Sequence, residues 1–409
     1  MIAPNQAAMT AATTIADTLA SPTIAHHEPS NRRFRPQSLA GGAVGIALLH
    51  IERARSGHGD DALARTWLTA AAREPISAGA NANLFHGAPA LGFALHAAGK
   101  TWSRRVLAAL DDTTITLTRT RLTAAHARID RGDPLVMREF DLIHGLSGLG
   151  VYHLRRHPDH PATHEVLSYL VRLTHPLPGP SGTENLPPWW MPVGLSGDPH
   201  PDYPDGHGNL GIAHGVGAVI ALMAIATLRH ICVPGLTDAL AALCAWTDQW
   251  RQPDGIGAWW PGYLTTDHAV RRTPPHRPRP SWCYGVSGTA RAQQLAGIAL
   301  GDTSRQTTAE NAILTALRDP NQRALLPGIG LCHGKAGLLQ AAFRMAIDGG
   351  NPAIAAELPG LAAELADQLA QPGAGHELMD GAAGAALALH TIGTGTPPAS
   401  AWDSALLLS

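Results

Sequence analysis

The sequence has few charges, few cysteines and no excess of basic residues. Only 15% of its 409 residues are charged, and the formal net charge is −2. There is therefore no basic field of the kind that nucleic-acid-binding proteins present. Four cysteines do not indicate a disulfide framework in a chain of this length. The first ten residues lack the basic and apolar regions of a secretory signal, so we expect a cytoplasmic protein.

No Ser/Gly-rich linker divides the chain, and 45% of the residues are hydrophobic. These features predict one large domain, 1–409, with many helices buried on all sides. We expect residues 1–35 to form a loosely ordered N-terminal extension. The stretch 211–228 is almost continuously apolar, but it contains His214 and several glycines. It is therefore interpreted as a buried helix in preference to a membrane span. The segments 174–205 and 271–280 are rich in Pro and Gly and predict long ordered loops.

A small-residue signature, Gly-x-x-(Gly or Ala), recurs seven times and leads each time into an apolar stretch. The glycine at a helix start tolerates unusual backbone angles, and the small residue three positions later lets neighbouring helices approach. The copies are Gly42–Gly45, Gly87–Ala90, Gly145–Gly148, Gly215–Ala218, Gly285–Gly288, Gly334–Gly337 and Gly381–Gly384.

The stretches after the signature, such as 45–50, 91–96, 149–154 and 219–224, predict inner helices, and amphipathic stretches such as 61–73 and 236–248 predict outer helices. Alternating inner and outer helices favour an all-α protein, a double-layered α/α toroid of about seven repeats. An open solenoid is the alternative. Closure is favoured because the second and sixth copies both begin with His-Gly and neither terminus resembles a polar cap.

Polar side chains recur immediately before the first glycine of most copies. The position directly before it holds His86, His144, His214, Tyr284, His333 and Asp380, and the position two before it holds Cys283 and Cys332. Because equivalent positions of consecutive repeats come close together, Cys283, Cys332 and His333 would supply three ligands of a tetrahedral zinc site with one corner left for water or substrate. The alternative is that both cysteines are ordinary buried thiols. Cys232 and Cys244 lie outside the signature and are predicted to be core residues.

Three blocks, taken together and in this order, resemble those of the lanthionine synthetase C-like (LanC) family. They are Asn209–Gly215 (NLGIAHG), Trp282–Gly288 (WCYGVSG) and Cys332–Gly337 (CHGKAG). The resemblance implies an α/α toroid that holds one Zn²⁺ ion through two cysteines and a histidine. It also implies a cyclase reaction, in which a peptide cysteine, activated as a zinc thiolate, adds to dehydroalanine or dehydrobutyrine to form lanthionine or methyllanthionine.

The resemblance also implies the residues that serve this addition. They are His214 as the acid, Asp141 as its partner, Arg279 as the donor to an enolate oxygen, and Tyr284 beside a metal ligand. Each has a simpler interpretation: Asp141 as a helix cap, His214 bonded to a backbone carbonyl, and Arg279 in a solvated basic loop where Arg277 is the competing choice. We expect structural roles for His86 and His144.

No dehydratase-like region accompanies these motifs, so the resemblance implies a stand-alone cyclase. Its partners would be a dehydrated precursor peptide, with leader and core, and a separate dehydratase, with which it would form a cytoplasmic modification complex. Two alternatives are an enzyme that adds glutathione or another small thiol to dehydrated residues, and a non-catalytic helical scaffold. Protein prenyltransferases, which also activate thiols on zinc, lack the three blocks and rank last.

Overall fold

The computed structural model describes residues 2–23, 35–175, 186–195, 197–255, 257–271 and 275–409. The chain groups into two compact units, each assembled from separate segments. The first unit comprises Met1–Thr114, Pro280–Trp282 and Ile313–Ser409, and the second comprises Ile115–Arg279 and Cys283–Ala312. That 1–409 forms a single domain stays a prediction.

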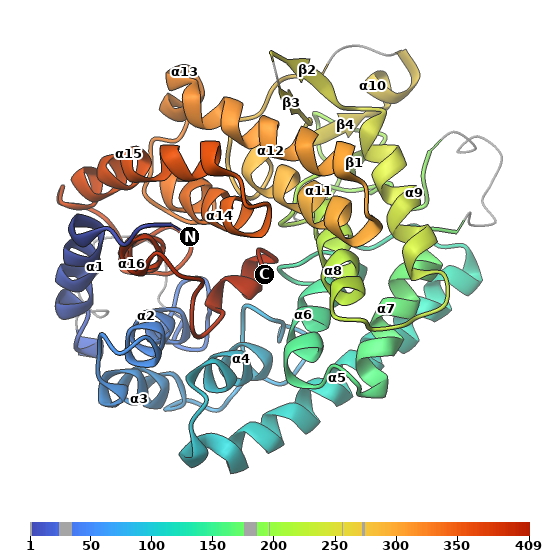
Figure 1. Cartoon of the computed structure of the whole chain (residues 1–409). Helices are drawn as coiled ribbons and strands as arrows, with labels where there is room; N and C mark the ends of the chain where they lie inside the picture. The colour runs from blue at the N-terminus through green and yellow to red at the C-terminus, as the bar shows by residue number, and fades with distance from the viewer. Residues whose placement is uncertain (1, 24–34, 176–185, 196, 256, 272–274) are drawn as a thin grey trace. The chain divides into compact units, whose positions relative to one another are not determined.

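The inner helices of the first unit are buried along most of their length. They are α2 (Ala43–Arg55), α4 (Ala88–Ala98), α14 (Lys335–Asp348) and α16 (Ala382–Thr394). Figure 1 shows α2 beside α4 and α16 beside α14, and α2 and α16 also pack against each other. Alanine and glycine supply much of their surface, which lets the helices approach closely.

The outer helices of the first unit each bury one face. They are α1 (Gln6–Thr18), α3 (Asp61–Ala71) and α15 (Pro352–Leu369). In α1, Ala8, Ala12 and Ala16 recur at the four-residue spacing that forms one helix face, and this face packs against α16. The expectation of a loosely ordered extension over residues 1–35 is therefore wrong for this part, because the alanine stripe gives the segment a buried face. Residues 24–34 lie outside the described residues.

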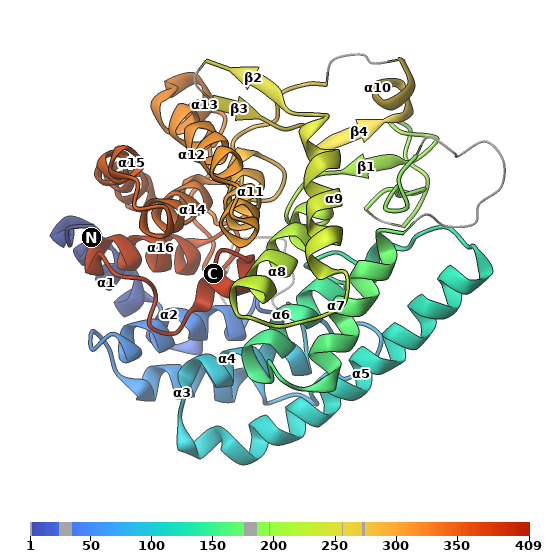
Figure 2. The same ribbon diagram turned by 45° about the vertical axis from the view of Figure 1, so that its right-hand side comes forward.

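The second unit repeats the pattern. Its inner helices α6 (Leu146–Arg156), α8 (Val216–Leu228) and α11 (Val286–Leu300) are packed in that order, with α8 between the other two (Figure 2). Its outer helices are α7 (Pro161–Leu173) and α9 (Leu236–Asp248). Two further helices, α5 (Arg104–Arg131) and α12 (Thr303–Arg318), contribute residues to both units.

The apolar stretch 211–228 is accounted for by α8, in which every residue from Val216 to Ala226 is buried. None of the described helices combines the length and the hydropathy needed to cross a membrane. The interpretation of this stretch as a buried inner helix is confirmed.

Among the described residues, four short strands lie in the longer connections, outside the two segments that the sequence predicts as loops. Strand β1 (His207–Asn209) pairs antiparallel with β4 (Tyr263–Thr265), and β2 (Gln252–Asp254) pairs antiparallel with β3 (Gly257–Trp259). Parts of the predicted loops 174–205 and 271–280 lie outside the described residues, namely 176–185, 196 and 272–274. The remaining elements are η2 (Thr101–Ser103), η3 (Met137–Glu139), α10 (Thr266–Arg271), α13 (Pro320–Ala324) and η4 (Trp402–Leu406).

All seven copies of the glycine signature begin an inner helix, as the sequence predicts. The first glycine of each copy is the N-cap residue of α2, α4, α6, α8, α11, α14 or α16. Only Gly87 adopts a positive φ, of 74°, whereas the others have extended backbones. Unusual backbone angles therefore do not explain the signature.

Close contact between each helix start and the preceding loop explains the glycine signature instead. A Cβ atom on Gly215 would lie 2.4 Å from the Asn209 carbonyl oxygen, and one on Gly334 would lie 2.4 Å from that of Gly328. The second small residue is under the same constraint, since a Cβ on Gly384 would lie 1.9 Å from the Leu378 oxygen. At these glycines the loop thus folds back over the first turn of its own helix, where a side chain would clash with backbone, whereas Ala90 and Ala218 occupy the second small position in two of the copies.

This crowding predicts opposite effects for two glycine substitutions in helices of the first unit. Gly384→Ala in α16 should destabilise the protein by about 1–3 kcal/mol, because the new methyl group must displace backbone. Gly360→Ala in α15 should stabilise it by about 0.5–1 kcal/mol, because nothing beyond the neighbouring residues and backbone of its own helix lies within 4 Å of the new methyl group, and alanine favours helix. Urea denaturation measures both, and equal effects would contradict the explanation.

Candidate metal and catalytic site

Backbone hydrogen bonds join the loops that precede successive inner helices, which we term the rim loops. In the first unit, the Cys332 amide donates to the Met379 carbonyl at 2.9 Å, and the Met379 amide donates to that of Ala40 at 3.1 Å. The Leu39 amide donates to the Phe85 carbonyl at 2.9 Å. Four of these five residues stand two positions before a signature glycine, so equivalent positions of neighbouring repeats lie side by side.

The second unit has the same arrangement. The Leu142 amide donates to the Ala213 carbonyl at 3.1 Å, and the Ala213 amide donates to the Cys283 carbonyl at 3.3 Å. Both Cys332 and Cys283 are therefore attached to backbone that a neighbouring rim loop holds in place.

Two cysteines and a histidine form a group that could hold a metal ion. Cys283 is joined by its peptide bond to Trp282 of the first unit, the unit that also contains Cys332 and His333. The ligand atoms of the three residues lie within 4.8 Å of one another. Donors of one tetrahedral zinc ion stand roughly 3.5 Å apart, given bond lengths of about 2.0–2.3 Å. Two thiols and an imidazole in this grouping are donor types that such an ion prefers.

A carboxylate in the next rim loop lies close to the histidine of this group. The Nε2 atom of His333 lies 3.3 Å from Oδ1 of Asp380, the residue directly before Gly381. Histidines that bind metals commonly use one ring nitrogen for the ion and the other for a carboxylate, which fixes the tautomer. The sequence places Asp380 among the recurring rim residues without assigning it a role. The available sequence signal for this role was that Asp380 lies in the repeat next to that of His333.

The second part of the site is a buried aspartate bonded to a histidine. Asp141 is completely buried, and its Oδ2 atom lies 2.6 Å from Nδ1 of His214. Its Oδ1 atom accepts the backbone N–H of His144 at 3.0 Å. The two interpretations of Asp141, as a cap of local backbone and as the partner of an imidazole, therefore describe the two oxygens of one carboxylate. The contact fixes the orientation of the His214 ring, which is 18% exposed.

Aromatic rings line the same region of the second unit. Tyr284 lies 6.2 Å from His214 and 4.7 Å from Tyr263, measured between ring centroids. Burial, and then the neighbouring Tyr263 hydroxyl, raise the pKa of Tyr284 far above its ordinary value, so it remains a neutral phenol that can donate a proton in a hydrogen bond. Tyr263 comes from β4, and nothing in the repeat pattern marks it.

His144 and His86 differ in their surroundings. The His144 ring stacks on that of His214 with a centroid distance of 6.0 Å, so it belongs to the group around Asp141. Burial lowers the pKa of His144, which keeps its ring neutral. His86 closes a tight turn, in which its amide and the Asn83 amide each donate to the other's carbonyl. The structural roles expected for both residues stay predictions.

The two candidate arginines are distinguished by their contacts. Arg277 pairs with Asp254 at 2.5 Å. Arg279 is exposed and has no hydrogen-bond or ion-pair partner within the described part of the chain. Its guanidinium is thus available to a ligand, whereas that of Arg277 is held by the protein.

The cysteines outside the signature form no disulfide and differ in exposure. Cys244 is buried on α9, as expected, and burial raises the pKa of its thiol to about 11. Cys232 is exposed, which contradicts its assignment to the core. It lies in the turn between α8 and α9, where the chain has already left the buried helix.

The comparisons agree with this architecture. The family described as "Lanthionine synthetase C-like protein" matches residues 33–407. A search of curated proteins found no match. Among solved structures, nisin cyclase superposes with a TM-score of 0.78 at 18% sequence identity, covering 98% of this chain and 96% of the other.

The likeness to nisin cyclase confirms the predicted fold class, an all-α, double-layered α/α toroid. The family match spans nearly the whole chain and includes the three sequence blocks and every residue of the candidate site. The chain therefore belongs to the lanthionine synthetase C-like family.

Proposed function

We propose that this protein is a zinc-dependent lanthionine synthetase, which closes thioether rings in a dehydrated peptide. The observation that carries the proposal is the grouping of Cys283, Cys332 and His333, whose ligand atoms lie within 4.8 Å of one another. Three protein donors with nitrogen and sulfur ligands are typical of catalytic zinc sites, in which the fourth position stays open. The family membership and the likeness to nisin cyclase support a cyclase-like role.

In this reaction the sulfur of a peptide cysteine bonds to the β-carbon of dehydroalanine or dehydrobutyrine. The electrons of the double bond move onto the amide oxygen, and the α-carbon then takes up a proton. A bound zinc ion supplies Lewis acidity that keeps an incoming thiol ionised at neutral pH. Cys283, Cys332 and His333 would hold that ion, and Asp380 would orient His333.

The Asp141–His214 pair is proposed to manage the proton. Because Oδ2 of Asp141 accepts the Nδ1 proton of His214, the Nε2 atom of the ring is left to exchange a proton with substrate. The carboxylate is rigid, since its other oxygen holds the backbone of His144. An imidazole fixed in this way can donate a proton to a carbanion-like carbon without first reorienting.

Arg279 and Tyr284 are proposed to stabilise the negative charge on the amide oxygen. Arg279 offers a guanidinium donor that pairs with no carboxylate among the described residues. Tyr284 directly follows the metal ligand Cys283 and stays protonated, so its hydroxyl can donate a hydrogen bond beside the reacting sulfur. Such donors act where charge develops during the reaction.

The proposed substrate is a precursor peptide that a separate dehydratase has already modified, and we place the two enzymes together in the cytoplasm. The family membership and the likeness to nisin cyclase support a peptide substrate.

The metal assignment predicts that cysteine substitutions fall into two classes. Cys332→Ala should lose most of its bound zinc, because one of three protein ligands is removed. Cys232→Ala should retain it, because this cysteine is exposed and lies outside the group. Inductively coupled plasma mass spectrometry of the purified proteins gives the stoichiometry. Unchanged zinc in Cys332→Ala would remove the basis of the proposed function.

The proton-transfer role predicts a loss of turnover without a loss of metal. His214→Asn should slow cyclisation of a dehydrated peptide by about 10²–10⁴-fold, the usual contribution of a general acid, while zinc content stays at the wild-type value. The matched control is His164→Asn on α7 of the same unit. Cyclisation is followed by mass spectrometry after free thiols are alkylated. A full rate in His214→Asn would exclude it as the acid.

The choice of thiol distinguishes a cyclase from an enzyme that adds a small thiol, because a cyclase uses a cysteine of the peptide itself. A dehydrated peptide that contains cysteine should be converted to alkylation-resistant rings with or without glutathione. The same peptide with serine in place of cysteine should gain no glutathione mass when the thiol is supplied. Rapid glutathione addition to the serine peptide would favour the alternative enzyme over the cyclase.

A further inference from the structure

The segment Ser400–Ser409 contains no α-helix, yet most of it is buried. Every residue from Trp402 to Leu408 is at most 2% exposed. The short helix η4 is flanked by Ala401 and Leu407, two non-glycine residues with left-handed backbones, φ 50° and 54°. Side chains disfavour this conformation, so it persists only where surrounding contacts impose it. We call this segment the strap.

One end of the strap is held by α2. Glu52 is buried on this helix, and its carboxylate accepts the backbone N–H groups of Ala399 and Ser400 at 2.9 and 2.8 Å. It also accepts the Ser400 hydroxyl at 2.5 Å. A single carboxylate thus fixes the point at which the chain enters the strap.

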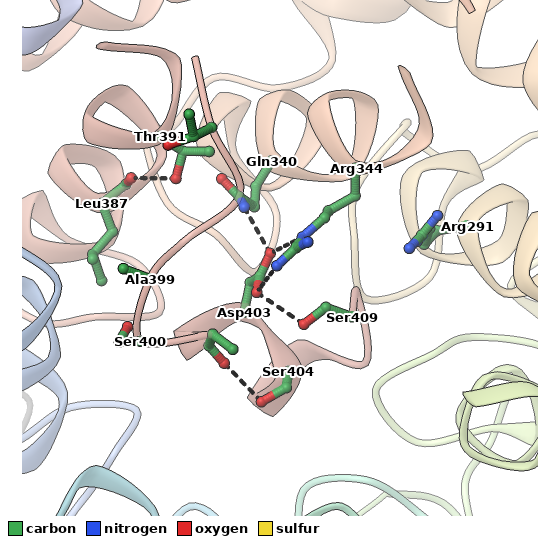
Figure 3. Close-up of polar contacts among 12 residues, drawn as sticks. Arg291, Gln340, Arg344, Leu387, Thr391, Ala399, Ser400, Asp403, Ser404 and Ser409 are labelled. Carbon is green, nitrogen blue, oxygen red and sulfur yellow. Dashed lines mark hydrogen bonds and ion pairs between the residues drawn. The ribbon is translucent and has the colours of Figure 1, made fainter. Parts of the chain in front are cut away.

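The middle of the strap is held by α14 through a charged network (Figure 3). Arg344 donates to both oxygens of Asp403 at 2.6 and 2.8 Å, and Gln340 donates to Oδ2 at 2.8 Å. Burial alone would raise the pKa of Asp403, which is fully buried. The charge of Arg344, together with hydrogen bonds from Arg344, Gln340 and Ser409, outweighs burial and lowers this pKa. The carboxylate is therefore ionised and the pair is bidentate, a geometry that fixes direction as well as distance.

The same strap also holds the segment that carries the first cysteine of the metal group. The indole N–H of Trp282 donates to the Leu406 carbonyl at 3.0 Å, and Trp282 is fully buried. Trp282 is bonded to Cys283, while α14 begins directly after Cys332, His333 and Gly334. Trp282 also packs on the first turn of α14, since a Cβ on Gly337 would lie 3.2 Å from its Cβ atom.

We propose that the strap is a positioning element for the metal site, which sets the separation of Cys283 from Cys332 and His333 through the Trp282–Leu406 hydrogen bond and the Asp403–Arg344 pair. The strap contacts none of the three ligands in these interactions. It acts through the residue before one cysteine and through the helix after the other. The inference rests on the proposed metal site.

The test compares two tryptophan variants of the full chain. Trp282→Phe keeps an aromatic ring and removes the indole donor to the strap. Its matched control is Trp67→Phe on α3, which removes an equally buried indole donor to a backbone carbonyl, that of Leu19, at 2.8 Å. Zinc affinity is measured by competition with a chromogenic chelator, and the geometry is read from the visible absorption of the cobalt-substituted proteins.

We expect Trp282→Phe to weaken zinc binding by roughly tenfold to a hundredfold, the range found when groups that orient metal ligands are removed, and to alter the cobalt spectrum. Trp67→Phe should lower the thermal midpoint by a similar amount and leave both metal readouts unchanged. Zinc affinity and cobalt spectra that are the same in the two variants would overturn the proposal.

A metal-free measurement separates this inference from the proposed function. Phenylarsine oxide bridges two thiols only when they are close together, so its affinity for the zinc-free protein reports the separation of Cys283 and Cys332, with Cys283→Ala as the reference for no bridging. Trp282→Phe should bind it more weakly than Trp67→Phe does. A wild-type protein that bridges the arsenical but holds no zinc would refute the metal assignment alone. Equal bridging in both tryptophan variants would refute the positioning role.

Discussion

The structure depends on the close contact between each rim loop and the first turn of the helix that follows it. Glycine is required there because the loop carbonyl oxygens approach to distances at which a side chain cannot be placed, as at Gly334 and Gly384. A rim loop packed against its helix in this way presents its backbone N–H groups to the neighbouring rim loop. The carbonyl oxygens of Ala213, Met379 and Cys283 accept these N–H groups. The architecture and the site therefore have the same physical origin.

The two carboxylates of the candidate site use this arrangement in parallel ways. Asp141 reaches His214 from the preceding rim loop, and Asp380 reaches His333 from the following one. In both cases one rim loop supplies the histidine, and the rim loop of an adjacent repeat supplies the acid. Orientation of an imidazole thus requires two adjacent repeats, which makes the pairs a property of the assembly and not of any one motif.

Much of this was available from the sequence because a repeat converts distance along the chain into proximity. The common position of Cys283 and Cys332 predicted that they would meet, and the small residues after each signature glycine predicted the inner helices. The residues that escaped prediction lie outside the repeat or depend on contacts from other segments. Tyr263 arrives on a three-residue strand, α1 packs through an alanine stripe, and Cys232 falls in a turn just beyond a buried helix.

The roles of Asp380 and Trp282 illustrate a further limit. Both residues were visible in the motifs, but a residue type does not reveal which atom it will bond. That His333 would present Nε2 to a carboxylate, or that an indole would bond to a carbonyl more than a hundred residues away, depends on side-chain direction, which only the folded chain defines.

The hydrogen bonds between rim loops carry a consequence for how such a centre changes over evolutionary time. The backbone of Cys332 is hydrogen-bonded to Met379, and that of Cys283 to Ala213, and neither neighbour belongs to the three candidate ligands. Bulkier or smaller side chains at those two neighbours would shift the thiols while preserving every coordinating group. The selectivity of the proposed metal site among thiophilic ions would then change without any replacement of its ligands.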